Sequence, residues 1–305
     1  MIALTKEKGF REVSNWEVFE MPGYTNSLNP KEEELKQILG KYEFLTHQKC
    51  GLSNCGTPHG KGYIVETASG KLTNIGSYCG KKHFSVEFEN LSREFDRYYR
   101  DYKAREKIET FSRSINSQFA AIKNIENDFG SIDNTYKIQQ YFKGKSKECP
   151  EIITQKLSKM VKENDPSIYL DKRLSDEEVE LRKASGQKNI PRYERIAIDR
   201  LTGLPFLHDY NDLRLLYAVE FKKPIEEISI LDIDSLISRD LDFWSKKIGE
   251  LDGTIRRIRE VMQDSQDFLK SENIVKIEKI IPENSDDFNY LLFILNANYS
   301  INFNQ

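Results

Sequence analysis

Three of the four cysteines and two of the four histidines in this 305-residue chain lie between residues 50 and 84. Cysteine thiolates and histidine nitrogens are the ligands that Zn²⁺ prefers in proteins. Four cysteines in a chain of this length are too few for a disulfide scaffold, so clustered cysteines indicate a metal site. The alternative interpretation, buried thiols beside surface histidines, leaves the clustering unexplained. We therefore predict one metal centre in this segment.

The order of residues within the segment predicts how the ligands are presented. Cys50 and Cys55 are each followed by glycine, which allows a tight turn that points both sulfurs at one ion. An alternating stretch at 62–75, with Ser-Gly at its centre, predicts a β-hairpin. Cys79 and His83 then stand four residues apart at the expected start of a helix, where they share one face.

These positions predict a tetrahedral site that three thiolates and one imidazole fill completely, which makes the zinc structural rather than catalytic. His59 competes with His83 for the fourth place, because it follows Cys55 by four residues, and His47 is a weaker candidate. The predicted ligands are Cys50, Cys55, Cys79 and His83.

A turn with two cysteines, a hairpin, and a ligand pair at a helix start resemble a treble-clef zinc finger over residues 50–84. The four residues between Cys50 and Cys55 depart from the commonest spacing of two in that family. The wider stretch 50–130 resembles an uncharacterised group of phage- and prophage-encoded proteins. That resemblance implies carriage on a mobile element and a role in host takeover, DNA metabolism or countering host defence.

A long helix is expected to follow the metal segment. Apolar residues recur at spacings of three and four from Phe84 to Tyr102, and again from Ile108 to Ile125. This pattern predicts about 40 residues of helix, broken once at most. Such a helix must pack against others, either in an intramolecular bundle, which we expect, or in a homo-oligomeric coiled coil.

The whole chain is predicted to be mainly α-helical, with a small treble-clef-like α+β module near its N-terminus. We expect one domain at 1–145, comprising an N-terminal strand, a short helix at 29–40, the zinc module and the long helix. An aperiodic linker at 142–151 leads to an α-helical domain at 146–305. The helical patterns in that domain lie at 151–163, 175–186, 211–222 and 232–271.

Composition limits the compartment and the partners. Charged residues make up 31% of the chain, and the mean hydropathy is -0.64. No apolar run approaches the ~20 residues that span a bilayer, and the N-terminus turns polar too early for a signal peptide. We therefore expect a cytoplasmic protein without membrane contact.

Nucleic acid is the alternative partner. The first 150 residues carry 23 Lys/Arg and 20 Asp/Glu, whereas the remainder carries 23 and 29, so a nucleic-acid contact is expected only in the first half. Basic side chains there could follow a phosphate backbone, although acidic residues alternate with them and favour a solvated face with ion pairs. The candidate contacts are Lys81, Lys82, Arg93, Arg97 and Arg100.

Enzyme signatures are missing from the sequence. We find no phosphate-binding loop, no dinucleotide fingerprint and no nucleophile elbow. A treble-clef nuclease needs a further histidine on the hairpin, and the predicted hairpin has none. We therefore expect a non-enzymatic, zinc-stabilised interaction protein with a protein partner, encoded by a phage or other mobile element. DNA binding is the alternative, and a metal-dependent nuclease is the third candidate.

Overall fold

The computed structural model describes residues 2–6, 9–13, 20–146, 148–282, 285–299 and 301. The chain forms two compact units. One comprises Met1–Phe111 and Asp232–Lys246, and the other comprises Ser112–Leu231 and Lys247–Gln305. The predicted domain boundary at 145 falls inside the second unit. Helices dominate and a small antiparallel sheet accompanies them, so the prediction of a mainly α protein is confirmed at this coarse level.

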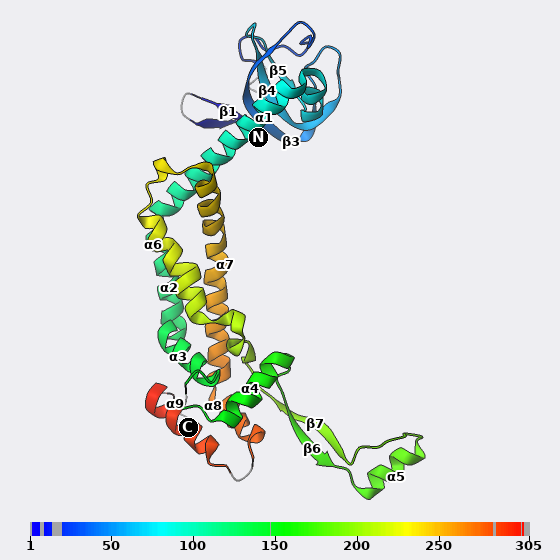
Figure 1. Cartoon of the computed structure of the whole chain (residues 1–305), viewed down its shortest axis with the longest axis vertical. Helices are drawn as coiled ribbons and strands as arrows, with labels where there is room; N and C mark the ends of the chain where they lie inside the picture. Colours follow the sequence, from blue (N-terminus) through cyan, green and yellow to red (C-terminus); the bar gives the residue numbers. More distant parts are fainter. Residues whose placement is uncertain are drawn as a thin grey trace. The chain divides into compact units, whose positions relative to one another are not determined.

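The first unit contains an antiparallel sheet with the strand order β2-β1-β3-β4-β5 (Figure 1). Strands β3 and β4 form its long central hairpin, and β5 returns along β4 through a tight turn. The strands are β1 (Ile2–Thr5), β2 (Phe10–Val13), β3 (Leu35–Lys49), β4 (Pro58–Thr67) and β5 (Leu72–Ile75). The expected N-terminal strand therefore exists as β2, and the part of it at 14–19 lies outside the described residues.

The helix predicted at 29–40 is wrong, because β3 begins within it. Ile38 pairs with Val65 of β4, and both side chains are buried in the core of the sheet module. Gly40 does not end a helix but lies inside the strand. A Cβ atom there would lie 2.8 Å from the carbonyl oxygen of Ala3, so glycine lets β1 approach closely. Pairing with distant strands outweighed the local helix signals.

The predicted long helix is interrupted twice. Helix α1 (Ser77–Arg113) contains a break at Ser85, whose φ of 47° and ψ of -129° are not helical. Ser114, with φ -105° and ψ 7°, separates α1 from α2 (Ile115–Phe129). The apolar spacing is compatible with both breaks, because it reports which face is buried and not the backbone angles of single residues.

Aromatic side chains join α1 to the sheet. Phe88 and Phe95 meet the ring of Tyr63 edge-on, with centroids 5.5 and 6.3 Å apart. Phe10 of β2 packs against Phe95 at 5.5 Å in the same geometry. Such edge-to-face pairs stabilise a core beyond the burial of their area alone. The core of the first unit therefore lies between the sheet and the first half of α1.

The second unit is built from helices and one two-stranded ribbon. The helices expected at 151–163, 175–186 and 232–271 are present, the last of them starting six residues later. Most of the pattern at 211–222 is a π-helix at Leu215–Lys222. The α-helices are α3 (Ile132–Phe142), α4 (Glu151–Glu163), α5 (Asp176–Ala184), α6 (Lys223–Ser229), α7 (Ser238–Leu269, which begins in the first unit), α8 (Ser271–Ile274) and α9 (Asp287–Tyr299).

The ribbon was not predicted. Strands β6 (Ser167–Arg173) and β7 (Tyr193–Arg200) pair antiparallel, and α5 connects them at the far end of the ribbon (Figure 1). Most side chains of both strands are exposed, including Leu170, Ile196 and Ile198, so the apolar residues of the ribbon do not form a buried face. Within the described ranges, no helix combines the length and apolar character needed to cross a membrane.

Candidate metal centre

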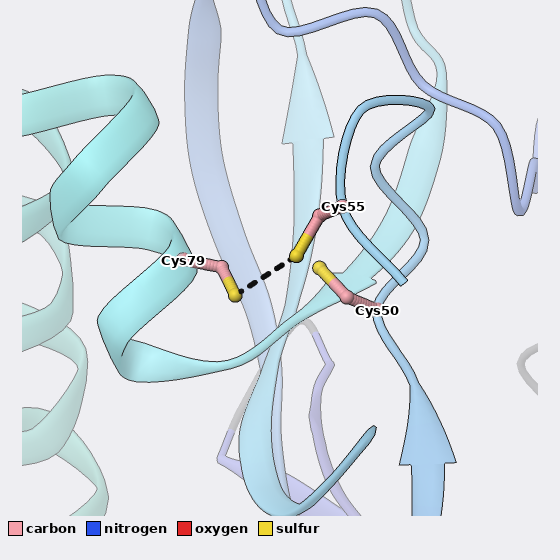
Figure 2. A group of neighbouring side chains, drawn as sticks. All are labelled: Cys50, Cys55 and Cys79. Carbon is pink, nitrogen blue, oxygen red and sulfur yellow. Dashed lines mark hydrogen bonds between the residues drawn. The ribbon is translucent and has the colours of Figure 1, made fainter. Parts of the chain in front are cut away.

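Three cysteine side chains converge between the β3–β4 connection and the start of α1 (Figure 2). The sulfur atoms of Cys50, Cys55 and Cys79 all lie within 4.8 Å of one another. The sulfurs of Cys55 and Cys79 lie 3.3 Å apart although the two residues are 24 positions apart in sequence. These three residues could therefore hold a metal ion together, as the sequence predicts for them.

The segment 50–55, here called the knuckle, is a tight loop closed by its own backbone. The amide of Cys50 donates to the carbonyl of Thr57 at 3.2 Å, and the amide of Cys55 donates to that of Leu52 at 3.1 Å. These bonds turn the chain so that both sulfurs point to the same side. The wider spacing of four residues is thus compatible with two converging thiols.

Hydrogen bonds with strand β5 fix the position of the knuckle. Gly51 donates its amide hydrogen to the carbonyl of Asn74 at 2.8 Å, and the Asn74 side chain donates to the carbonyl of Lys49 at 2.8 Å. The hydroxyl of Thr73 donates to the Gly51 carbonyl at 3.2 Å. A Cβ atom at Gly51 would lie 2.0 Å from that hydroxyl oxygen, so only glycine fits there.

The two glycines that follow the knuckle cysteines therefore differ in importance. Gly51 is required by close contact with β5, whereas a Cβ atom at Gly56 would meet nothing within 4 Å. Sequence reasoning missed Thr73 and Asn74, which are polar yet almost fully buried. The sequence marks these two residues only by their position between Leu72 and Ile75 in a short strand. Polar side chains buried in such a place are hydrogen-bonded as a rule.

The break in α1 determines where Cys79, the candidate ligand on this helix, lies. Gly80, next to Cys79, packs so closely on Phe88 that a Cβ atom would lie 2.5 Å from the ring. In a continuous helix, residues eight apart are separated by about 12 Å along the axis. The break at Ser85 therefore allows the first turn of α1 to fold back on the rest of the helix and to direct Cys79 toward the knuckle.

The three thiols differ in their acidity. Burial, together with a hydrogen bond with Cys55, raises the pKa of Cys79 to about 12. Burial also raises the pKa of Cys50. In Cys55 burial acts in the same direction, but hydrogen bonds from the side chain and backbone of Thr57 outweigh it and lower the pKa to about 7. A bound cation stabilises all three thiolates, so metal binding releases protons.

The histidines predicted to complete the site lie outside the group of converging sulfurs. Among the described residues, no histidine nitrogen belongs to the set of ligand atoms within 4.8 Å of one another. Burial and the charge of Lys82 lower the pKa of His83. His83 as the fourth ligand stays a prediction.

His59 has different surroundings. Its Nδ1 lies 2.7 Å from the hydroxyl of Tyr42, the two rings stack with centroids 5.8 Å apart, and its Nε2 is buried without a hydrogen-bond partner. His59 lies on β4, because that strand begins at Pro58 rather than at 62 as the sequence suggested. The hairpin thus contains a histidine, which is partly buried and whose Nδ1 is engaged with Tyr42.

A pocket of about 460 Å³ opens beside two of the thiols, Cys50 and Cys55. No carboxylate belongs to its wall, which is polar and contains two basic residues. The other lining residues are Tyr24, Asn26, Ser27, His47, Gln48, Lys49, Leu52, Ser53, Gly56 and Asn74.

The basic residues proposed to contact nucleic acid all lie on the first two thirds of α1. Lys81 forms an ion pair with Glu89 at 3.3 Å, and Arg100 forms one with Asp242 at 3.4 Å. Within the described part of the chain, Lys82 makes no ion pair. Two of the five candidate basic residues are therefore paired with acidic groups.

No protein-family model matches the chain, and no curated protein or solved structure matches it. The function is therefore inferred from the geometry of the site itself.

Proposed function

We propose that the chain is a non-enzymatic interaction protein in which Cys50, Cys55 and Cys79 bind one structural Zn²⁺. The supporting observation is the convergence of three sulfurs from two distant segments. Thiolates are soft ligands, and Zn²⁺ accepts several of them in a tetrahedral arrangement without a redox change. Zinc would tie the knuckle to the first turn of α1 and thereby fix the helix relative to the sheet.

The proposed partner is a protein that contacts the segments held by the metal. Tyr78, which precedes Cys79, is 77% exposed, and Val86, which follows the break in α1, is 67% exposed. Leu45, near the end of β3, is fully exposed. Two of these three exposed apolar residues lie on α1, one on each side of its break, and exposed apolar side chains of this size supply binding energy when a partner covers them. A phage or prophage origin, with a host protein as the partner, stays part of this proposal.

The first experiment measures zinc in the purified full-length protein and in two matched variants. We expect one zinc per chain in the wild type and none in Cys79→Ala. Cys149→Ala is the control, because Cys149 is also buried but lies in the second unit. It should retain the metal. Equal zinc contents in all three proteins would contradict the proposed centre.

The second experiment tests the interaction. A partner recovered with the wild-type chain would be purified and titrated against Tyr78→Ser and Val86→Ser. We expect each substitution to weaken binding about tenfold, because a large apolar side chain at an interface contributes roughly 1–2 kcal/mol. Tyr193→Ser, at an exposed tyrosine of the second unit, is the control and should bind normally. Equal affinities for all variants would exclude this surface.

DNA binding has less support, because Lys81 and Arg100 of the five candidate contacts are already paired with acidic side chains. Phosphate contacts produce binding that weakens steeply as salt increases. We expect no mobility shift of duplex or single-stranded DNA at low salt. A shift that is salt-dependent and weakened by Arg97→Ala would favour DNA as the partner instead.

A further inference from the structure

We infer that the metal centre keeps its fourth coordination position open toward the pocket beside Cys50 and Cys55, where it binds a small thiol from solution. This inference rests on the proposed zinc centre and adds a ligand-binding site to it. A zinc ion held by three protein ligands keeps a fourth position that a ligand from solution can occupy, and it still ties the knuckle to α1.

The sulfur positions match three corners of a tetrahedron. With Zn–S bonds of ~2.3 Å, tetrahedral angles place neighbouring sulfurs about 3.8 Å apart. The separation of 3.3 Å between Cys55 and Cys79, and the upper bound of 4.8 Å for the whole group, bracket that value. Among the described residues the group contains no fourth ligand atom.

The pocket provides the approach to the remaining corner. Cys50 and Cys55 belong to its wall, whereas Cys79 does not. Cys55 is only partly buried, in contrast to Cys50 and Cys79, each 4% exposed. A molecule of about 460 Å³ or less can therefore reach the thiolates from the side of the knuckle without any change in the fold.

The histidines are poorly placed to close the site. The Nε2 of His59 is not among the converging ligand atoms, its Nδ1 contacts the Tyr42 hydroxyl, and its ring is so close to Gly76 that a Cβ atom there would lie 2.8 Å from it. His83 is not part of the pocket wall. His47 does line the pocket, yet its nitrogens lie outside the sulfur group. His47 is therefore the residue that a test must exclude first.

The charges around the pocket favour an anionic sulfur donor. Three thiolates and one Zn²⁺ carry a net charge of about -1, and a fourth thiolate makes it about -2. Lys49 in the wall offsets part of this charge, and no carboxylate belongs to the wall to oppose it. In the binding step, the thiol loses its proton to solvent, its sulfur forms a bond to zinc, and the water that occupied the fourth position leaves.

Cobalt substitution tests this inference in the full-length protein. Co²⁺ in a thiolate site gives absorption bands whose intensity follows the number of bound sulfurs. We expect 2-mercaptoethanol to increase the sulfur-to-cobalt band by about one third, saturably, as a fourth sulfur joins three. Ethylene glycol, which has a similar size and no sulfur, should have no effect. His47→Ala should show the same spectrum and the same response.

Three results would overturn the inference. An unchanged wild-type spectrum would show that the fourth position is closed. A different initial spectrum in His47→Ala, His59→Ala or His83→Ala would identify the histidine that closes it. Disappearance of the visible bands on adding thiol would show that cobalt is extracted rather than coordinated. If Co²⁺ fails to bind, or binds equally to Cys79→Ala, the proposed metal centre itself fails, which separates that failure from a closed fourth position.

Discussion

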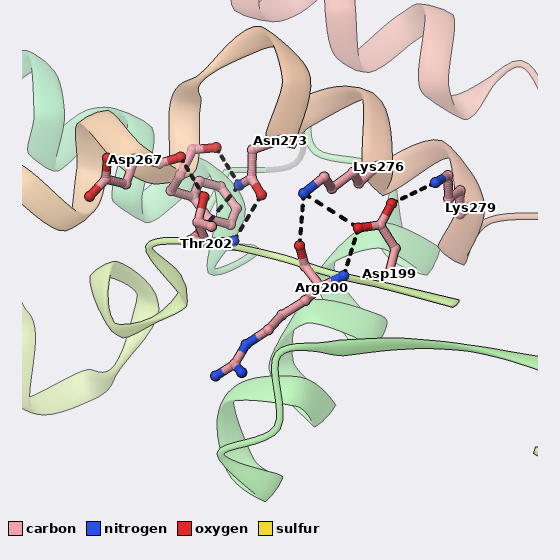
Figure 3. A network of polar contacts seen from close by, with 8 residues as sticks. Asp199, Arg200, Thr202, Asp267, Asn273, Lys276 and Lys279 are labelled. Carbon is pink, nitrogen blue, oxygen red and sulfur yellow. Dashed lines mark hydrogen bonds and ion pairs between the residues drawn. The ribbon is translucent and has the colours of Figure 1, made fainter. Parts of the chain in front are cut away.

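Two regions of this protein join distant segments by different chemistry. In the first unit, three thiols of the knuckle and α1 converge, and the direct link between the two segments is a weak hydrogen bond of 3.3 Å between the sulfurs of Cys55 and Cys79. In the second unit, the side chain of Asn273, 1% exposed, accepts a hydrogen bond from the Thr202 amide at 2.8 Å. It donates in return to the carbonyls of Thr202 and Phe268, at 3.1 and 2.8 Å (Figure 3).

An ion-pair cluster extends the network around Asn273. The carboxylate of Asp199, at the end of β7, lies 2.6 Å from Lys279 and 3.4 Å from Lys276. Lys276 also donates to the carbonyl of Arg200 at 3.0 Å (Figure 3). Both lysines lie on the 3₁₀ helix η6 (Val275–Ile280), so the cluster attaches β7 to it.

The difference lies in what each connection requires. The amide of Asn273 finds its donors and acceptors within the protein, so this connection is complete as folded. Three neighbouring thiolates repel one another unless a cation lies between them. We therefore expect the first connection to respond to metal removal, and the second to respond only to substitution or to strong acid.

Metal removal gives the largest expected effect and acts on the first unit alone. Binding to the folded state stabilises a protein by ~4 kcal/mol when the free ligand is a thousandfold above its Kd. We expect a chelator to lower the melting temperature of the first unit and to leave the second transition unchanged, as measured by calorimetry. Cys79→Ala should already melt at the lower temperature and ignore the chelator. If the chelator lowers the melting temperature of both units, the metal does not stabilise the first unit alone.

Asn273→Ala should have the next largest effect, on the second unit alone. The substitution leaves the Thr202 amide and two carbonyls without partners in a buried place, at a cost of about 2–3 kcal/mol. Denaturant unfolding measures this cost. Thr202→Val is a matched control, because it removes only the hydroxyl that donates to the Asp267 carbonyl at 3.0 Å, and it should cost less. If both variants lose a similar free energy of unfolding, the buried hydrogen bonds of the Asn273 side chain do not have the stabilising effect expected here.

Acid should weaken the second unit through Asp199. Hydrogen bonds from Lys279 and from the Arg200 amide lower the pKa of Asp199 to about 2. Since the pKa in the unfolded chain is about 3.9, this carboxylate contributes stability above that pH and loses it as the pH falls toward 2. Unfolding at pH 5 and pH 2.5 should therefore differ less in Asp199→Asn than in the wild type. If the stability difference between pH 5 and pH 2.5 is the same in Asp199→Asn and the wild type, protonation of Asp199 is not the cause of the acid sensitivity.

Leu45→Ser should have the smallest effect on stability. The side chain is fully exposed, and surface substitutions of this kind usually change the free energy of unfolding by less than about 0.5 kcal/mol. The same substitution should weaken binding of a partner that docks on the metal-held segments. A large loss of stability would show instead that Leu45 packs within the first unit.

Some elements followed from short stretches of sequence. The helix predicted at 175–186 is present as α5, which begins with a complete capping box between Ser175 and Glu178. Helix α4 and the linker before it were also predicted, because periodicity and breakers lie within a few residues of one another. The clustering of Cys50, Cys55 and Cys79 likewise indicated the metal ligands before any fold was known.

Other features were decided only by contacts between distant residues. The segment at 35–40 became a strand because β1 and β4 pair with it, and Gly40 reflects the approach of β1. The break at Ser85 lets Gly80 pack on Phe88, and a hydrogen bond from the Asn74 side chain to the carbonyl of Lys49 fixes the chain at the start of the knuckle. Sequence by itself determined which residue types could bind a metal. Tertiary structure decided which of them meet, because the distance between side chains depends on strand pairing and helix packing that no local pattern records.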